Sequence, residues 1–404
     1  MKLVGQALDL VCIAPVHVGN GTTLKAYEYL FDKRRKEALF LREPAWISFL
    51  AKHGLTDGFA QYIEDTAQKL NGKGNFKGLY LWDYLHTKRI AEREIRALAI
   101  RRAQVLVEKD KGSANDIALQ AALADGRPYI PGSAVKGALR TGLLYRYLKQ
   151  HEAVRERYWN ELLRKVQWEK NKEIDRTCSA VIQSLETEAF HCLGANPKSR
   201  DDAVNSVLRG LRISDAAVLE KEKDTVILQK TDATQKTSRD GRQARTISLF
   251  RECIPAGRRL RFSITADFSM LEKIGISSIA EIVQWTRAYT QDGLSWQRKF
   301  FGGAYGYVFD EAEEADLLLG GGTGFLSKTI VRALAPSEEA ARDFTARLLD
   351  KKFTSPDKRT GKRVPAHKHM IQDGTLSPRT LKLAAYGQDT WALGLCRLEE
   401  AKGC

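Results

Sequence analysis

The sequence predicts an α+β protein of two sheet-and-helix units with helical insertions. Strand-like segments, a helix and further strands occupy residues 1–270, and a helix followed by strands returns in residues 271–404. Helix-like sequence over about 43–124 and 151–206 interrupts the first unit. At roughly 150 residues per domain, a chain of 404 residues has room for two or three domains with their own hydrophobic cores.

The first unit opens on a strand. Residues 3–16 alternate and then continue as apolar residues, and the glycine-containing segment 17–21 is typical of a turn. From residue 43 onward the pattern is mainly helical. Between residues 84 and 109 apolar positions recur at helical spacing among several arginines, which indicates a helix with a solvated charged face.

The clearest local unit is RPYIPGSAVKGALRTGLLYRYLKQ at residues 127–150. A short strand leads into a Pro-Gly turn and then a helix. Further helices are expected in the insertion at 151–206. Strands return over 211–268, with a polar basic loop near 231–245 and a hairpin turn at 255–257.

The second unit opens on a helix. Ser278 followed by Glu281 three residues later predicts a capping box at its start. Four features follow in order: an acidic run at 310–316, a glycine cluster at 320–324, a basic loop at 351–369 and a final strand in WALGLCRLEE.

The charge balance favours a polyanionic partner. Lysine and arginine outnumber aspartate and glutamate by 65 to 50, a net charge of +15. Nucleic acid is preferred over an anionic membrane surface, because no apolar stretch is long enough to cross a bilayer. The N-terminus resembles a strand more than a signal peptide, so the expected compartment is the cytoplasm.

Cysteine spacing gives no support for a metal site. None of the six cysteines falls in a C-x-x-C pair. Cys178, His191 and Cys192 resemble zinc ligands but lack a matching second pair. We therefore expect neither a metal nor a cofactor.

The helix start near residue 133 is a candidate anion site. Ser133 is placed as the N-cap, and Lys136 in the first turn opposes the helix dipole unless an anion binds there. Gly137 leaves room for a close backbone approach, and Arg140 lies one turn beyond Lys136. These residues would converge on a phosphate. The alternative is an ordinary exposed lysine beside a tight turn.

A second candidate is the glycine cluster Gly320, Gly321, Gly322 and Gly324, with Lys328 after it. Such clusters expose N–H groups to an anion. The spacing matches neither a Walker A loop nor a dinucleotide fingerprint. A flexible strand connection is the alternative. A valine at Gly322 should be tolerated by the fold, provided that the position does not need positive φ.

His17 and two basic stretches complete the candidates. A histidine can act as acid or base in RNA cleavage, although a structural histidine at a strand end is the commoner case. Residues 230–261 hold nine lysines and arginines against three acids, and residues 351–369 hold seven against one. Each stretch could follow an RNA backbone or be a solvated loop.

Several of these segments together resemble a known family. PYIPGSAVKGALRT is similar to the signature of the RAMP proteins of CRISPR systems. A further set of segments, spread from residue 14 to residue 384, resembles one branch, the fifth Csm subunit that caps type III-A complexes: APVHVGNGT, RISDA, LFREC, LGGGTGFLSKT and LSPRTLKLA. The helical insertions do not carry the resemblance.

The resemblance implies tandem ferredoxin-like (RRM-like) domains, divided as 1–270 and 271–404, at the head of a filament wound on a guide RNA. Such a subunit holds the 3′ part of the guide and meets the repeated backbone subunit. The small subunit and a target single-stranded RNA are further partners in the complex. Carried over residue by residue, Ser133, Lys136 and Arg140 would contact guide phosphates. The glycine loop with Lys328 would support RNA or a neighbouring subunit.

Three functions stay open at this point. The first is a non-catalytic RNA-binding subunit, since the resemblance implies no catalytic residue. The second is a metal-independent endoribonuclease that processes guide RNA through His17. The third is a free-standing basic protein that binds nucleic acid.

Overall fold

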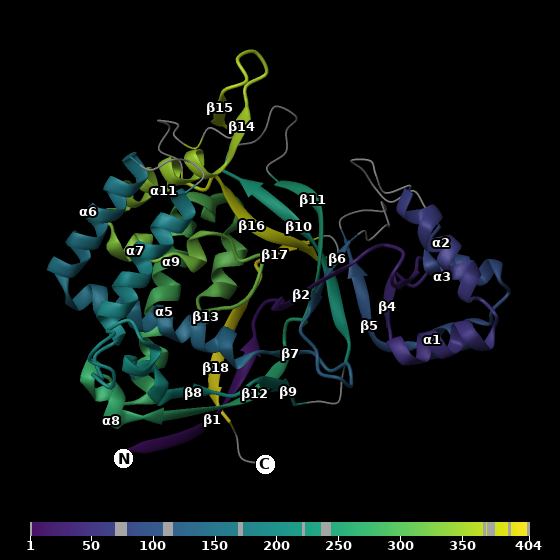
Figure 1. Cartoon of the computed structure of the whole chain (residues 1–404), viewed down its shortest axis with the longest axis horizontal. Coiled ribbons are helices and arrows are strands. Elements are labelled where there is room, and N and C mark those ends of the chain that lie inside the picture. The colour runs from purple at the N-terminus through teal and green to yellow at the C-terminus, as the bar shows by residue number, and fades with distance from the viewer. Residues whose placement is uncertain are drawn as a thin grey trace.

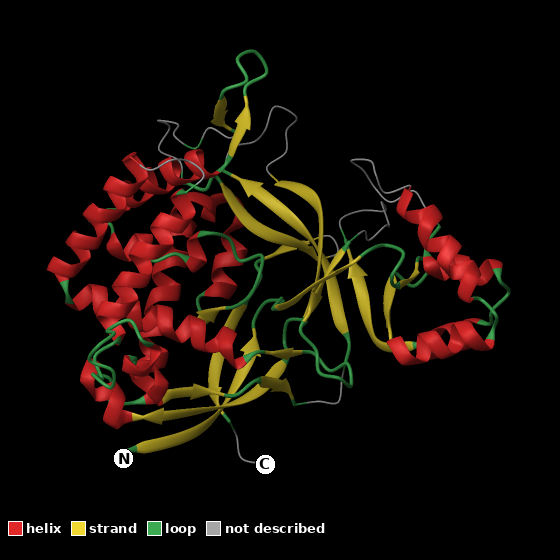
Figure 2. Ribbon diagram, in the orientation of Figure 1, coloured by secondary structure: helices red, strands yellow, loops and turns green. Residues whose placement is uncertain are grey.

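The computed structural model confirms the α+β class. It describes residues 2–68, 79–107, 116–168, 173–219, 223–235, 244–366, 369, 376–386 and 389–401. A larger body of helices and strands connects through a sheet to a smaller helical lobe (Figure 1). Figure 2 shows the helices gathered at the two ends of the molecule, with the strands between and below them.

The first sheet is built around the N-terminal strand β1 (Leu3–Cys12). It pairs antiparallel with β12 (Arg259–Asp267) on one side and with β18 (Leu395–Glu400) on the other. The shorter strands of this sheet are β7 (Tyr129–Ile130), β8 (Leu211–Ile213), β9 (Ala216–Val218) and β13 (Leu317–Leu318). The first and last long strands of the chain are therefore neighbours.

The second sheet is built around β10 (Thr225–Thr234). One edge of β10 pairs antiparallel with β11 (Ala244–Cys253). Its other edge is shared by β5 (Ala99–Leu106), which runs parallel, and by β16 (Thr380–Tyr386), which runs antiparallel. The remaining strands are β2 (Gly19–Leu24), β3 (Leu30–Asp32), β4 (Glu37–Leu41), β6 (Ile117–Gln120) and β17 (Asp389–Trp391). A separate hairpin, β14 (Thr354–Pro356) and β15 (Arg363–Pro365), projects from the larger body (Figure 1).

Helices cover the first sheet and enclose the largest hydrophobic core. The long helices are α5 (Gly132–Gln150), α6 (Glu152–Trp168), α7 (Ile174–Phe190), α9 (Ile279–Ala312) and α11 (Glu338–Lys352), with the short α8 (Phe268–Leu271) and α10 (Val331–Leu334) beside them. Single-turn 3₁₀ segments among the described residues are Ala203–Asn205, Val207–Gly210, Glu272–Ile274 and Leu326–Lys328. Leu139 and Leu143 of α5, Ile282 of α9 and Ile264 of β12 are buried in this core.

The capping box at Ser278 is confirmed in a shifted form, because the Glu281 side chain bonds to the residue before the N-cap. The Ser278 hydroxyl accepts a hydrogen bond from the Glu281 N–H at 3.1 Å, and the Glu281 carboxylate accepts one from the Ser277 N–H at 3.1 Å. The helix then runs past the predicted segment into the acidic run, with one non-helical residue at Tyr305.

The first insertion is only partly helical. Its helices are α1 (Glu43–Lys52), α2 (Thr56–Gln68), α3 (Leu81–Thr87) and α4 (Glu92–Ala97), which pack around a cluster of their own. The helix predicted over 84–109 is wrong beyond Ala97, because residues 99–106 form β5. There Ala103 and Val105 are buried at a spacing of two, so the strand period replaces the helical one.

Both sheets take strands from both parts of the chain. The first sheet combines β1 and β12 with β13 and β18, and the second combines β10 with β16. The division at residue 270 stays a prediction, and the two parts are interleaved at the level of strand pairing.

Candidate nucleic-acid interface

The start of α5 differs from its predicted form. The N-cap is Pro131, without a side-chain cap, and Ser133 lies exposed inside the first turn. The Gly132 N–H donates a hydrogen bond to the Asp215 carboxylate at 2.7 Å. A Cβ added to Gly132 would lie 2.4 Å from the Ile213 carbonyl oxygen, so only glycine fits. The Asp215 carboxylate of the RISDA segment thus already binds one of the N–H groups at the start of α5, where a phosphate was expected.

Lys136 and Arg140 have different surroundings. The Lys136 ammonium donates a hydrogen bond to the Leu208 carbonyl at 2.8 Å, and burial lowers the pKa of Lys136. Arg140 is exposed, with its guanidinium 3.4 Å from the Glu186 carboxylate. Lys136 therefore does not point outward beside Arg140, because its ammonium is bound to the 3₁₀ segment Val207–Gly210. Arg140 keeps its charge at the surface.

The glycine cluster packs against the turn at His17. The Gly321 N–H donates to the His17 carbonyl at 2.7 Å, and a Cβ on Gly320 would lie 1.9 Å from the same oxygen. Gly322 has φ of 90°, and a Cβ there would meet Leu393 Cδ1 at 2.6 Å. The condition for tolerating valine at Gly322 is therefore not met, since the position needs positive φ. Gly324 also has positive φ, at 91°.

The two predicted motifs come together on one face of the body. A pocket of about 320 Å³ is lined by Gly137 and Arg140 of α5, by residues of α9, and by Gly320 and Lys328 after it. None of the described residues that line it is an aspartate or glutamate. The Lys328 side chain reaches solvent, and the pKa of its ammonium is lowered by partial desolvation and by the Arg251 guanidinium. The fold thus joins two cations that are far apart in sequence, and RNA contact by these residues stays a prediction.

His17 is a buried residue in this fold. Its side chain is 5% exposed, and Nδ1 lies 2.7 Å from the Glu252 carbonyl oxygen, to which an Nδ1–H donates. Burial lowers the pKa of His17, and Arg251 and Lys328 lower it further. The ring is covered by the backbone at Gly321. This environment is that of a structural histidine, and it gives no support to catalysis by His17.

Glu252 is a central residue that sequence reasoning missed. Its carboxylate is fully buried and accepts two hydrogen bonds from the Arg101 guanidinium at 2.6 and 2.7 Å. The Thr225 hydroxyl and the Gln120 N–H also donate to it, at 2.8 and 3.0 Å. Glu252 thereby ties β11 to β5, β6 and β10. Its place within the LFREC segment was a possible signal, but only the fold shows that it is buried.

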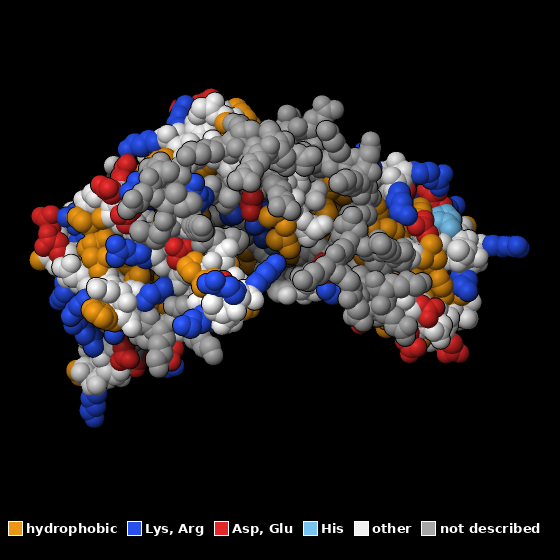
Figure 3. Space-filling view, turned by 90° about the horizontal axis from the view of Figure 1, so that it is seen from above, with side chains coloured by type: hydrophobic (Ala, Val, Ile, Leu, Met, Phe, Trp, Pro, Cys, Tyr) orange, Lys and Arg blue, Asp and Glu red, His pale blue; other side chains and the backbone are white. Residues whose placement is uncertain are grey.

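The two basic stretches also meet. Lys230 and Asp232 of the first stretch and Lys352 and His369 of the second line one pocket of about 670 Å³. Much of the first stretch, from 236 to 243, lies outside the described residues. Seen from above, the molecule has a concave outline, and several Lys and Arg side chains lie on the larger lobe beside the hollow (Figure 3).

Two negative findings concern the described residues alone. Within them, no three His, Cys, Asp or Glu side chains gather as metal ligands would. No helix in the same set combines the length and the apolar character needed to span a membrane.

Comparison with known proteins places the chain in a family. A family model described as the RAMP superfamily matches residues 9–327. The chain is 26% identical to a CRISPR system protein named Csm5 from Enterococcus italicus over 97% of this chain and 96% of that one. It is 25% identical to Csm5 of Streptococcus thermophilus over 80% of each, and 26% identical to Csm5 of Mycobacterium tuberculosis over 97% of this chain and 96% of that one.

A similar fold occurs in a solved structure. One chain of the cryo-EM structure of a Csm–crRNA–target RNA ternary complex, from a type III-A CRISPR-Cas system, aligns with a TM-score of 0.63. The identity is 18%, over 98% of this chain and 100% of that one. The family model and the sequence relatives confirm the resemblance to RAMP proteins and to the fifth Csm subunit, and the solved structure shows a similar fold. The chain therefore belongs to the RAMP superfamily.

Proposed function

We propose that this protein is the RNA-binding cap subunit of a type III-A CRISPR effector complex. It holds the 3′ part of the guide RNA and closes the backbone filament. Its partners are the guide, the target single-stranded RNA, the repeated backbone subunit and the small subunit. The Csm5 names of its relatives and the net charge of +15 support this assignment.

One observation carries the proposal. Arg140 of α5 and Lys328 after the glycine loop line a single pocket that has no carboxylate among its described lining residues. Gly137 leaves the surface of α5 open beside Arg140, because a Cβ there would meet no atom within 4 Å. A cationic face that a ligand can approach closely suits an RNA phosphate chain, which is held by charge rather than by base identity.

The test is cross-linking of the assembled complex. The subunit should cross-link to the 3′ portion of a guide RNA of fixed register, through peptides that include α5 or Lys328. The 5′ end of the same guide is the internal control. Cross-links confined to that end, or to RNA of random sequence, would contradict the cap assignment.

Two other functions are separated by simple measurements. Cleavage of guide precursor by the purified chain would favour the endoribonuclease, and the burial of His17 speaks against it. Purification without any other subunit would favour a free-standing nucleic-acid-binding protein.

A further inference from the structure

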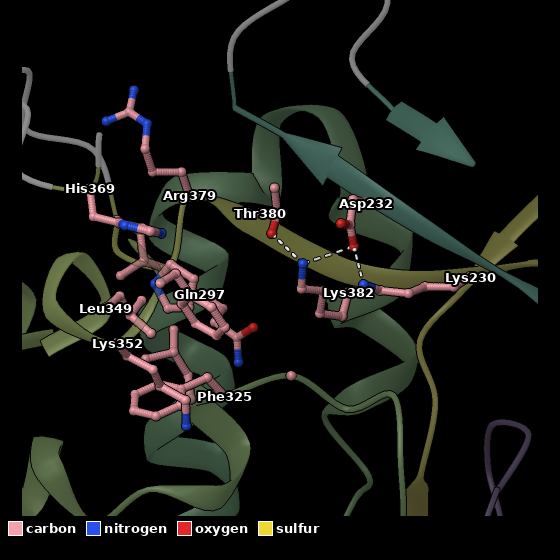
Figure 4. Close-up of a pocket in the computed structure, with 15 residues that line it drawn as sticks. Lys230, Asp232, Gln297, Phe325, Leu349, Lys352, His369, Arg379, Thr380 and Lys382 are labelled. Atoms are coloured by element: carbon pink, nitrogen blue, oxygen red, sulfur yellow. Dashed lines mark hydrogen bonds and ion pairs between the residues drawn. The ribbon is translucent and has the colours of Figure 1, made fainter. Parts of the chain in front are cut away.

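The 670 Å³ pocket is built from segments far apart in the sequence. Lys230 and Asp232 come from β10, Thr380 and Lys382 from β16, and Phe325 from the glycine loop. Leu349 and Lys352 of α11, Gln297 of α9, His369 and Arg379 complete the labelled lining in Figure 4. A pocket of this volume is within the range that holds a small organic ligand.

Its two sides have different chemistry. On one side, Lys382 donates hydrogen bonds to Asp232 at 2.8 Å and to Thr380 at 2.6 Å, while Lys230 lies 3.4 Å from the same carboxylate. Figure 4 shows this network on the strands, with Phe325, Leu349 and Gln297 grouped on the opposite side. Leu326, Phe353, Leu376 and Pro378 add further apolar side chains to the lining.

The charge of the pocket is positive. Lys230, Lys352, Arg379 and Lys382 face one carboxylate, Asp232, among the described lining residues. Because two lysines share Asp232, the strand network alone keeps one positive charge. Lys352 has its own partner outside the pocket, Asp175, at 2.9 Å. Arg379 reaches away from the centre to the rim (Figure 4). An anionic group is therefore favoured at the strand side of the pocket and its rim.

Gln297 adds a group suited to a base edge. Its side chain is 8% exposed, and its one hydrogen bond among the described residues goes from Nε2 to the Gly293 carbonyl at 3.3 Å. The amide lies beside the apolar side of the pocket (Figure 4). An amide pairs with the donors and acceptors of a nucleobase edge, while an aromatic ring such as Phe325 stacks on its face.

The pocket adjoins the face proposed above along the chain. The single 3₁₀ turn Leu326–Lys328 separates the two, with Leu326 lining this pocket and Lys328 lining the smaller one. Gly324 brings the loop backbone against the stem of Lys382, because a Cβ there would lie 3.3 Å from Lys382 Cγ. One RNA strand that follows Arg140 and Lys328 would reach Phe325 next.

We propose that this pocket takes a single unstacked nucleotide of the guide RNA, with the base against Phe325 and Gln297 and the phosphate on Lys230 and Lys382. This rests on the proposed RNA-binding function and adds a defined nucleotide site to it. An acidic peptide of a neighbouring subunit would match the lysines but would leave the aromatic and amide groups unused, so a nucleotide fits better.

The test uses the assembled complex with 4-thiouridine placed at one guide position at a time. One position should cross-link to the peptide that holds Phe325, and a neighbouring position should cross-link to α5 or Lys328. In full-length chain binding to short single-stranded RNA, Phe325→Ala should weaken affinity roughly 5- to 100-fold, the effect of losing one base stack. Phe325→Tyr keeps the ring and should bind as the parent does.

A charge variant gives an independent measurement. Lys230→Gln leaves the closer Lys382–Asp232 pair in place and should reduce the salt slope of RNA binding by about 0.7. Lys33→Gln, which removes a lysine paired with Asp83 at 2.9 Å in the helical lobe, is the matched control and should not change the slope. Circular dichroism shows whether each variant is folded. If Phe325→Ala does not fold, the salt slope of Lys230→Gln still tests the nucleotide pocket.

The outcomes separate the two proposals. Guide cross-links to α5 or Lys328, without any at Phe325 and with unchanged binding by both variants, would overturn the nucleotide pocket alone. A cross-link from Phe325 to another subunit would overturn it in favour of a peptide site. Absence of every guide cross-link from this chain in the complex would contradict the RNA-binding function itself.

Discussion

At the scale of single residues, the hydrogen-bond partner decides what a cation can do. Lys136 and Arg140 lie one turn apart on α5 and have equal formal charge. The Lys136 ammonium donates a hydrogen bond to a backbone carbonyl at 2.8 Å. Arg140 is exposed, and the Glu186 carboxylate lies farther from its guanidinium, at 3.4 Å. We therefore expect Lys136 to stabilise the fold and propose that Arg140 contacts RNA.

Substitution of Lys136 should change stability, whereas substitution of Arg140 should change RNA binding. Lys136→Met leaves the Leu208 carbonyl without its donor and should lower the free energy of unfolding by about 1 kcal/mol, with little change in RNA binding. Arg140→Gln should leave stability within about 0.5 kcal/mol and reduce the salt slope of single-strand binding by about 0.7. Urea unfolding and salt titrations of RNA affinity measure the two quantities. An unchanged slope for folded Arg140→Gln would remove Arg140 from the interface.

His17 should make stability depend on pH. The folded protein holds the pKa of His17 below its ordinary value of 6.5, whereas the unfolded chain has the ordinary value. Unfolding therefore takes up a proton between these two values, and stability falls as the pH is lowered through 6.5 toward the folded pKa. In urea unfolding over this pH range, the free energy of unfolding should fall less on acidification for His17→Asn than for the parent.

RNA cleavage provides the functional control for His17. Cleavage by the correctly assembled complex should be unaffected by His17→Ala. Loss of a general acid or base lowers a rate by roughly a hundredfold or more, so a drop of that size would restore the endoribonuclease hypothesis.

At the scale of elements, the crossing of α5 and α9 positions the proposed interface. A Cβ on Gly142 would lie 2.5 Å from Thr286 Cα, so the two helices touch through their backbones at this point. Gly137, five residues earlier on the same helix, faces open space. The same residue type is therefore needed for packing at one position and leaves a surface open at the other.

Alanine at the two glycines should separate packing from binding. Gly142→Ala should destabilise the protein by about 1–3 kcal/mol, because the added methyl group forces α5 and α9 apart. Gly137→Ala should stabilise it by about 0.5–1 kcal/mol through helix propensity, yet weaken RNA binding if the RNA backbone lies on this surface. Thermal unfolding and RNA titration give both results. A stable Gly137→Ala protein with normal affinity would mean that the RNA does not approach α5 closely there.

At the scale of the whole molecule, the N-terminal strand pairs with the C-terminal strand. β18 lies beside β1, and Leu395 and Cys396 of β18 are fully buried. The hairpin of β14 and β15, unlike β18, is not part of either large sheet. Its two ends meet at its base, where the Ala366 N–H donates to the Phe353 carbonyl at 2.7 Å. Its strand β15 is exposed throughout.

Two deletions should behave differently. Removing residues 395–404 opens one edge of β1 and uncovers the core, so we expect an insoluble or unfolded chain. Replacing 354–365 by a short glycine linker should leave the free energy of unfolding within about 0.5 kcal/mol. The second deletion removes Lys358, Arg359, Lys362 and Arg363, so RNA affinity measured on it tests whether this basic loop binds RNA. If the first deletion variant unfolds cooperatively at the same urea concentration as the parent, pairing of β18 with β1 is not needed for the fold.

The sequence by itself determined the α+β class, the capping box at Ser278, the basic character and the resemblance to RAMP proteins, because periodicity, caps, charge and motifs are local properties. Tertiary structure decided the rest. It turned residues 99–106 into a strand, gave the predicted anion site at α5 the Asp215 carboxylate, and buried Glu252 against Arg101. It also brought Arg140 to Lys328, and Phe325 to Lys382, across long stretches of chain. Such meetings depend on which strands pair and which helices cross, and local sequence pattern carries no information on that choice.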